Sequence, residues 1–343
     1  MPLAPFLELL QSVCNRENLT SGQAEDAMAH ILSGDLPSSQ IAGFLIALRM
    51  KGETADELFG FARAMRARCV RVDVGLPGEA ILDTCGTGGD GASTFNISTV
   101  SSFVVAGAGV RVAKHGNRSI SSHCGSADIL EALGVAIVQP PERVAAAIRE
   151  IGIGFLFAPA FHPSMKAAMV VRNELKMRTA FNLLGPLCHP ANATVQLVGA
   201  PSRQAAELIA QTLALLGLKR GFVVHGLEGL DEISTLGKTL IFDIHGGAID
   251  ERMVEPADFG APKARMEELR GGSREANAAI ARQVLGGGSG PHRDIVLVNA
   301  AAALVVAGRV PDFITGMSTA AESIDSGAAL AKLDRLAAYT QGS

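Results

Sequence analysis

From residue 1 to about residue 72, the spacing of apolar side chains predicts helices only. Apolar residues recur every three or four positions, which gathers them on one face of a helix. Thr20–Ser21 followed by Glu25 predicts the start of one helix, Pro37 the start of a second and Thr54 the start of a third. No run in this region is typical of a strand. We therefore expect a small helical unit.

Near residue 80 the pattern changes to short apolar runs separated by helical periods. A buried helix is expected from Asn96 to Gly107, and from about residue 262 to the end only helices are expected, including Asp294–Ala307. Such alternation is typical of an α/β domain with a largely parallel sheet. The predicted strands are 80–83, 110–113, 135–138, 153–158, 194–199, 221–225 and 239–244.

The segment from about 165 to 185 again has a helical pattern, which a Leu-Gly-Pro sequence interrupts at 184–186. It could pack on the N-terminal helices while the chain passes between domains.

Composition narrows the class of protein. With 343 residues, of which 48% are hydrophobic and 19% charged, the chain can bury a large core. A net charge of −4, no Trp and one Tyr disfavour nucleic acid as the main partner. We expect no membrane span and no signal peptide, because no apolar run reaches 18 residues and no basic region precedes one. Five scattered cysteines without CxxC spacing predict reduced thiols and a cytoplasmic protein.

A glycine-rich loop, here called the first loop (residues 86–96, GTGGDGASTFN), follows the predicted strand at 80–83. Glycines let the backbone approach a ligand and point several N–H groups the same way. The helix that follows adds free donors at its N-terminus, and Ser98 and Thr99 add hydroxyl groups. By itself this pattern fits a tight turn with a helix cap equally well. It lacks the GKS/T ending of NTPases.

A second loop (residues 114–126, KHGNRSISSHCGS) follows the predicted strand at 110–113. Lys114 and Arg118 beside small and hydroxyl residues suit a polyanion. Two such loops, each between a strand and a helix, indicate a ligand with separated phosphate groups.

An acidic loop (residues 226–234, GLEGLDEIS) follows the predicted strand at 221–225. Adjacent carboxylates suit Mg²⁺, which binds through one or two carboxylates together with substrate phosphates. Alone, Asp231 and Glu232 would more simply be a solvated turn. Beside two anion-binding loops, a magnesium site is the better interpretation.

Together these motifs, with Arg172 six residues before the start of the motif RTAFNLLGPL (178–187), and GPHRD (290–294), resemble anthranilate phosphoribosyltransferases over nearly the whole chain. The resemblance implies an α/β fold of the nucleoside phosphorylase/phosphoribosyltransferase type, with a small all-helical domain and a larger α/β domain whose central sheet is largely parallel and flanked by helices. The helical domain would comprise residues 1–72 plus about 165–185, and the α/β domain 73–164 and 186–343. The resemblance also implies a homodimer formed through the small domains.

The activity implied is transfer of the 5-phosphoribosyl group from phosphoribosyl pyrophosphate to the amine of anthranilate, with Mg²⁺, in tryptophan biosynthesis. Carried over by position, the metal ligands would be Ser98, Asp231 and Glu232, and the anthranilate contacts Gly86, Asn117 and Arg172. The residues expected to hold phosphoribosyl pyrophosphate are Gly86, Gly89, Asp90, Thr94, Asn96, Ile97, Ser98, Thr99, Lys114, His115, Gly116, Asn117, Arg118, Ser119, Ile120, Ser121, Ser122 and Ser126.

Three positions depart from the family pattern. Cys188-His189 stands where Thr-Asn is common, and Cys124 where Ser is common. A neutral aromatic amine needs no general base, so none is assigned. Two alternatives remain: a pyrimidine nucleoside phosphorylase, which would not need the acidic pair as metal ligands, and a non-catalytic nucleic-acid-binding paralogue, which would need a basic face.

Overall fold

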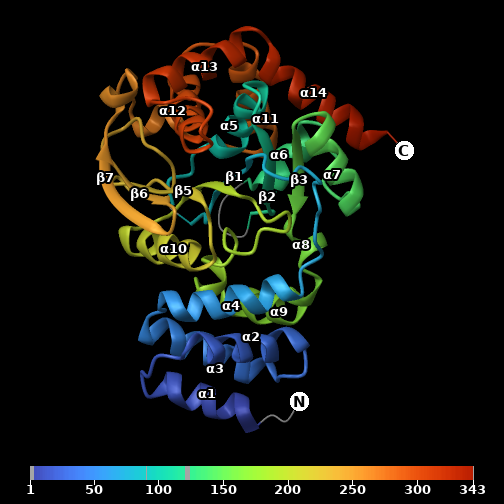
Figure 1. Ribbon diagram of the computed structural model, residues 1–343, viewed down its shortest axis with the longest axis vertical. Helices are drawn as coiled ribbons and strands as arrows, with labels where there is room; N and C mark the ends of the chain where they lie inside the picture. The colour runs from blue at the N-terminus through green and yellow to red at the C-terminus, as the bar shows by residue number, and fades with distance from the viewer. Residues whose placement is uncertain (1–3, 90, 120–123, 343) are drawn as a thin grey trace.

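In the computed structural model, which describes residues 4–89, 91–119 and 124–342, an N-terminal bundle of helices stands beside a larger α/β part. Figure 1 shows the bundle at the bottom, the sheet above it and the C-terminal helices at the top. The predicted fold class is confirmed: a helical bundle joined to a larger α/β domain with a mostly parallel sheet.

The bundle begins with four helices whose starts follow the local sequence. The side chain of Thr20 caps α2 by accepting from the N–H of Gln23, and that of Thr54 caps α4 by accepting from the N–H of Glu57. Apolar faces of these helices share one core. The helices are α1 (Ala4–Cys14), α2 (Ser21–Ser33), α3 (Ser38–Lys51) and α4 (Ala55–Ala67).

One ion pair is buried within this bundle. Lys51 Nζ lies 2.9 Å from Glu57 Oε2, and the two side chains are 3% and 0% exposed. Glu57 also accepts hydrogen bonds from the backbone N–H groups of Leu19 and Thr54. The carboxylate therefore ties the start of α4 to the α1–α2 connection.

The 165–185 segment is less helical than predicted. Helix α9 (Lys166–Leu175) packs on α2 and α3, but it ends at Leu175, because the next residue, Lys176, is in the left-handed conformation. Only a short 3₁₀ turn, Ala180–Asn182, follows. The expected packing against the N-terminal helices is confirmed, because Ala168, Val171 and Phe181 belong to the bundle's core.

The sheet has seven strands in the order β3-β2-β1-β4-β5-β6-β7. The first five in this order are parallel, and β6 and β7 join antiparallel at one edge. The parallel strands end at a common edge, which is where ligands bind in open α/β sheets. The strands are β1 (Ile81–Gly86), β2 (Arg111–Gly116), β3 (Ile153–Phe157), β4 (Val195–Gly199), β5 (Arg220–Gly226), β6 (Thr239–His245) and β7 (Ala248–Val254).

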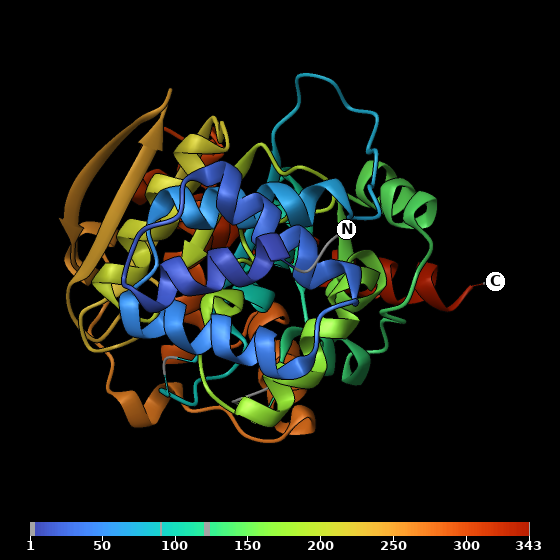
Figure 2. The ribbon, with the colours of Figure 1, turned by 90° about the horizontal axis from the view of Figure 1, so that it is seen from below.

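Helices cover both faces of the sheet, as Figures 1 and 2 show from two directions. One face packs against a core shared with α5, α6 and the C-terminal helices, and the other against α7 near β2 and α10 near β5. Leu82 and Val112 contribute to the first core, and Ala113 and Val223 to the opposite face. The helices are α5 (Ile97–Gly107), α6 (Ser126–Ala132), α7 (Pro141–Glu150), α8 (Ala158–Phe161), α10 (Arg203–Leu215), α11 (Arg274–Leu285), α12 (Pro291–Val306), α13 (Phe313–Asp325) and α14 (Ala328–Gln341).

One predicted strand is not a strand in the structure, and one strand in the structure was not predicted. Residues 135–138 alternate in burial as a strand would, but they form a loop in which Val135 and Ile137 enter the core and the Ala136 N–H donates to Thr340 Oγ1. A side chain of helix α14, instead of a neighbouring strand, therefore accepts a backbone hydrogen bond from this segment. Strand β7 was missed because it carries three charged residues in a row and pairs on one side only, where alternation and burial no longer coincide.

Among the described residues, no helix combines the length and the apolar character that crossing a bilayer requires.

Candidate substrate and metal site

Four parallel strands, β1, β2, β4 and β5, each end in glycine at the same sheet edge. The missing side chains make room for the loops above. A Cβ on Gly199 would lie 1.6 Å from the Asp231 carbonyl oxygen, and one on Gly86 would lie 2.5 Å from Asp231 Oδ2. These two strand ends therefore admit the acidic loop, which folds back over β1 and β4.

The two predicted metal carboxylates reach the first loop from about 140 residues away in sequence. Asp231 Oδ2 accepts a hydrogen bond of 2.9 Å from the Gly88 N–H, and Glu232 Oε1 accepts one of 3.0 Å from the Ser98 N–H. The structure thus brings together Gly86, Ser98 and both carboxylates, the residues that the sequence proposed for metal and phosphate binding.

Gly88 and Gly89 also contact an arginine that the sequence did not assign to the site. Arg178 Nη1 donates to the Gly88 carbonyl at 2.6 Å. Gly89 has φ +76°, and a Cβ there would lie 1.6 Å from Arg178 Nη1. Asp90, which was also predicted to hold the donor, lies outside the described residues.

The end of the first loop is tied to the second loop through Asn96. Its Nδ2 donates to the Cys124 carbonyl, and its Oδ1 accepts from Asn277 Nδ2, each at 3.0 Å. Ile97 and Thr99 are each 1% exposed, so their side chains lie on the buried face of α5. Thr94 forms an isolated bridge with Arg270. Asn96 and Ser98 therefore lie at the loop, whereas Ile97 and Thr99 support it from below.

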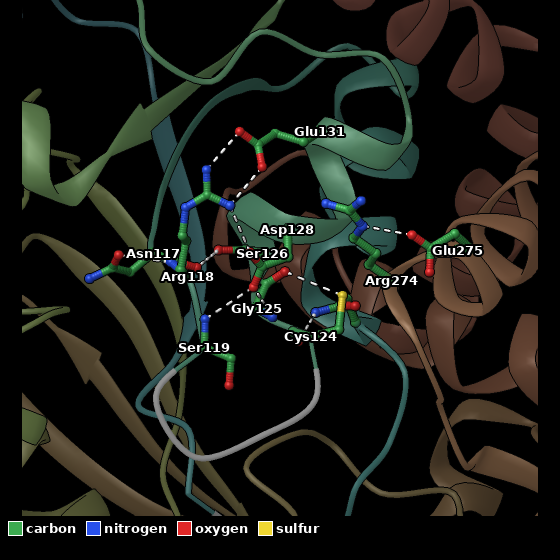
Figure 3. A network of polar contacts seen from close by, with 11 residues as sticks. Asn117, Arg118, Ser119, Cys124, Gly125, Ser126, Asp128, Glu131, Arg274 and Glu275 are labelled. Carbon is green, nitrogen blue, oxygen red and sulfur yellow. Dashed lines mark hydrogen bonds and ion pairs between the residues drawn. The ribbon is translucent and has the colours of Figure 1, made fainter.

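Figure 3 shows the carboxylate of Asp128 beside Ser119 and Gly125 in the second loop. Asp128 Oδ2 accepts from the N–H groups of Ser119 and Gly125 at 3.2 and 2.8 Å, so it joins the two arms of the loop. The Arg118 guanidinium binds Glu131 with two hydrogen bonds of 2.6 and 2.7 Å and Asp128 with one of 2.9 Å. These bonds lower the pKa of Glu131 and, against partial burial, that of Asp128. Arg118 thus faces α6.

Asn117 follows β2, and Ser126 ends the second loop at the start of α6. Ser126 Oγ donates to the Asn117 carbonyl at 3.3 Å, and Asn117 Oδ1 accepts from the Arg118 N–H at 2.7 Å. A Cβ on Gly116 would lie 2.1 Å from Ser126 Oγ, which explains the glycine. Ile120, Ser121 and Ser122 lie outside the described residues.

Lys114 lies beneath the first loop. The residue is 3% exposed, and its ammonium group donates to the Thr84 carbonyl at 2.5 Å. Burial lowers the pKa of Lys114, and the negative charge of Asp83 opposes that shift. Burial also raises the pKa of Asp83, and the positive charge of Lys114 opposes this second shift. We interpret Lys114 as a buried positive charge under the ends of β1 and β2.

His115 belongs to a buried histidine cluster, defined as His115, His162 and His189. The His115 ring lies 5.4 Å from His162 and 5.6 Å from His189, measured between ring centroids. Burial, and for His115 also the neighbouring imidazoles, lowers the pKa of His115 to about 3 and those of His162 and His189 to about 4. His189 Nε2 lies 2.7 Å from the Ala113 carbonyl. His189 is one of the departures from the family pattern. Its neutral imidazole therefore holds the Ala113 carbonyl of β2.

Arg172 lies in the last turn of α9, in the segment that reaches the first loop through Arg178. Its guanidinium lies 5.5 Å from the centre of the Phe181 ring, and Nη1 lies 3.6 Å from Met169 Sδ. Burial lowers the pKa of Arg172. The structure therefore places Arg172 half-buried beside this segment, with side-chain contacts to Phe181 and Met169.

A cavity of about 770 Å³ adjoins the other side of the first loop, lined by residues 91–93 and 270–275. The sequence did not indicate that the first loop lies beside residues 270–275 at the start of α11. It also missed Arg178, Asp128, Glu131 and Asn277. Asp128 stands at the start of a predicted helix and Arg178 within a motif, but their partners are distant in sequence, so pattern alone could not assign them.

The arrangement suits a polyphosphate bound with a hard cation. Two loops offer backbone N–H groups, and the two carboxylates of the acidic loop are within hydrogen-bonding reach of the first loop. Mg²⁺ needs few protein ligands when phosphate oxygens and water complete its shell. Asp231 and Glu232 therefore fit a substrate-assisted magnesium site.

Comparison with known proteins gives matching results over both parts of the chain. Residues 7–69 match the helical bundle domain of a glycosyl transferase family, and residues 78–330 match the a/b domain of that family. The anthranilate phosphoribosyltransferase of Solibacter usitatus is 60% identical over 97% of this chain and 98% of its own. That of Moorella thermoacetica is 50% identical over 97% of each chain.

Solved structures agree. The anthranilate phosphoribosyltransferase of Thermus thermophilus matches with a TM-score of 0.91 and 41% identity over 97% of this chain and 99% of that one. The Saccharomyces cerevisiae enzyme in complex with PRPP and Mg matches with a TM-score of 0.91 and 30% identity over 99% of each chain. From its sequence, its fold and its loops, this chain belongs to the anthranilate phosphoribosyltransferase family.

Proposed function

We propose that this protein transfers the 5-phosphoribosyl group of phosphoribosyl pyrophosphate to the amine of anthranilate, releasing pyrophosphate. The observation that carries the proposal is the meeting of the acidic loop with the first loop and the first turn of α5, through the Asp231–Gly88 and Glu232–Ser98 hydrogen bonds. The same meeting favours a transferase over a phosphorylase, because binding inorganic phosphate would not need a pair of metal carboxylates. The yeast relative in complex with PRPP and Mg supports it.

In this proposal the first and second loops hold the donor. Backbone N–H groups near Gly86 and Gly89 and the side chains of Asn96 and Ser98 face the diphosphate, and Asn117 and Ser126 complete the second loop. Amides held in a fixed loop can stabilise the negative charge that develops on the departing pyrophosphate. Lys114 contributes its charge from below. Mg²⁺, held by Asp231, Glu232 and Ser98, would neutralise pyrophosphate.

The acceptor is held by Arg172 and Asn117, and it also contacts Gly86. A guanidinium can bind a carboxylate with two parallel hydrogen bonds, and this orients the amine toward the anomeric carbon. The amine attacks as its neutral form, so this chain supplies no general base. We infer that the protein works in the cytoplasm, in tryptophan biosynthesis, and that residues 1–72 with 165–185 form a domain that pairs in a homodimer.

The test is the loss of anthranilate fluorescence on mixing protein, anthranilate and phosphoribosyl pyrophosphate, with Mg²⁺ and with excess chelator. We expect turnover only with Mg²⁺. Replacing both Asp231 and Glu232 with Ala should abolish turnover while a cooperative thermal transition remains. The matched control is Asp250→Ala with Glu251→Ala, an exposed acidic pair on β7, which should keep full activity. Wild-type turnover in chelator would refute the metal role.

A further inference from the structure

Gly88 in the first loop has both of its backbone polar groups bound by side chains from other parts of the chain. Its N–H donates to Asp231 Oδ2 at 2.9 Å, and its carbonyl accepts from Arg178 Nη1 at 2.6 Å. One glycine therefore joins a carboxylate of the acidic loop to an arginine from the segment that follows α9.

The contact with Arg178 is closely packed. At Gly89, a Cβ would lie 1.6 Å from Nη1 and 2.9 Å from Cζ of Arg178, so the guanidinium fills the place that a side chain would take. Gly89 also has φ +76°, a conformation that favours glycine. The glycine pair thus accommodates an arginine as well as a ligand.

The backbone of Arg178 is tied to the helical bundle. Its carbonyl accepts a hydrogen bond from Nη1 of Arg49 on α3, and the next N–H, of Thr179, donates to Asn182 Oδ1 at 2.9 Å. Arg172 lies at the end of α9 in the same segment. A continuous path of contacts therefore runs from α3 through Arg178 to Gly88 and Asp231.

We propose that Arg178 is a positioning residue that couples the helical bundle to the first loop, so that the segment carrying Arg172 and the phosphate-binding loop keep one relative position. A planar guanidinium suits this task because it holds a carbonyl in a defined direction, which a flexible ammonium does not. The inference rests on the proposed function for what the loop binds, but not for the contacts themselves.

The test separates loop positioning from turnover by measuring the affinity of pyrophosphate with Mg²⁺ by calorimetry, without anthranilate. Arg178→Met should weaken this affinity roughly tenfold, the effect expected for one hydrogen bond from a charged group. The KM for phosphoribosyl pyrophosphate should rise by a similar factor, with a smaller rise in the KM for anthranilate. Arg178→Lys, which keeps the charge, should restore part of the affinity.

Arg66→Met is the matched control, because Arg66 Nε donates to the Leu187 carbonyl at 2.6 Å and so makes the same kind of contact away from the first loop. Its pyrophosphate affinity should stay within about twofold of wild type. Arg49→Met should weaken binding less than Arg178→Met does, and should add nothing to it in the double variant.

The proposal is overturned if Arg178→Met binds pyrophosphate as wild type does, if the Arg66 control loses as much affinity, or if the effect of Arg49→Met is undiminished in the double variant. Wild-type protein whose pyrophosphate affinity depends on Arg178 but which does not consume anthranilate would refute the proposed function and leave this inference standing.

Discussion

Glu131 should affect donor binding although it is not among the residues proposed to contact the donor. Its carboxylate holds the Arg118 guanidinium, which in turn binds Asp128, the residue that closes the second loop. Replacing Glu131 with Gln removes the charge and one good acceptor but keeps the shape. If Arg118 acts by holding the loop, Glu131→Gln and Arg118→Gln should both raise the KM for phosphoribosyl pyrophosphate.

The expected size of the change in KM follows from how exposed the Arg118–Glu131 pair is. Arg118 is 47% and Glu131 32% exposed in the side chain, so water and salt screen the pair. A well-formed exposed pair contributes about 0.5–1 kcal/mol, which corresponds to a roughly two- to fivefold change in KM. Direct contact of Arg118 with a phosphate would instead contribute about 1.5–3 kcal/mol, or roughly 10- to 150-fold.

Initial-rate assays on the two single variants and the double variant distinguish these cases. If Arg118 acts through the loop, the double variant should resemble Arg118→Gln, because Glu131 acts only through Arg118. Glu251→Gln is the control: Glu251 also holds an arginine, Arg203, with two hydrogen bonds, but on β7. The reasoning is refuted if Arg118→Gln raises the KM for phosphoribosyl pyrophosphate 50-fold or more while Glu131→Gln leaves that KM unchanged.

Three further predictions follow from burial and charge. Arg172→Ala should raise the anthranilate KM roughly 10- to 150-fold while donor affinity stays nearly unchanged; an equal loss of both affinities, measured by titrating each substrate, would contradict its assignment. The histidine cluster has lowered pKa values, so the unfolded chain binds more protons below about pH 6.5. Stability should therefore be complete above that pH and fall toward pH 4, with a shallower fall of Tm for His189→Asn than for wild type; parallel curves would refute this. Glu57→Gln should lower unfolding free energy by about 3–5 kcal/mol in urea titration, because it leaves Lys51 buried without its counter-charge, and a loss below about 1 kcal/mol would contradict this.

The order of helices and strands could largely be predicted from the sequence, because apolar periodicity records which face of each element is buried. The failures lie where that link breaks. Residues 135–138 bury alternate side chains without a strand to pair with, and β7 pairs with a strand while its side chains stay largely exposed. At the end of α9, the left-handed Lys176 is a backbone feature that no apolar pattern records.

The site divides in the same way. The glycine-rich loops and the acidic pair were visible in the sequence, since a backbone that approaches phosphate needs glycine and magnesium needs carboxylates. Their orientation was not. Arg118 and His115 stand within a phosphate-binding motif, yet Arg118 faces Glu131 and His115 packs in the histidine cluster.

The sequence alone therefore determined which residue types this protein presents at its sheet edge, and only the tertiary structure decided which of them meet. Asp231 reaches Gly88, and Arg178 reaches Gly88 from the other side, across separations of 143 and 90 residues. Those contacts depend on parallel strands that end together and on glycines at 86 and 199 that leave room for Asp231. Local propensity cannot encode them, because each partner's position is fixed by packing elsewhere in the fold.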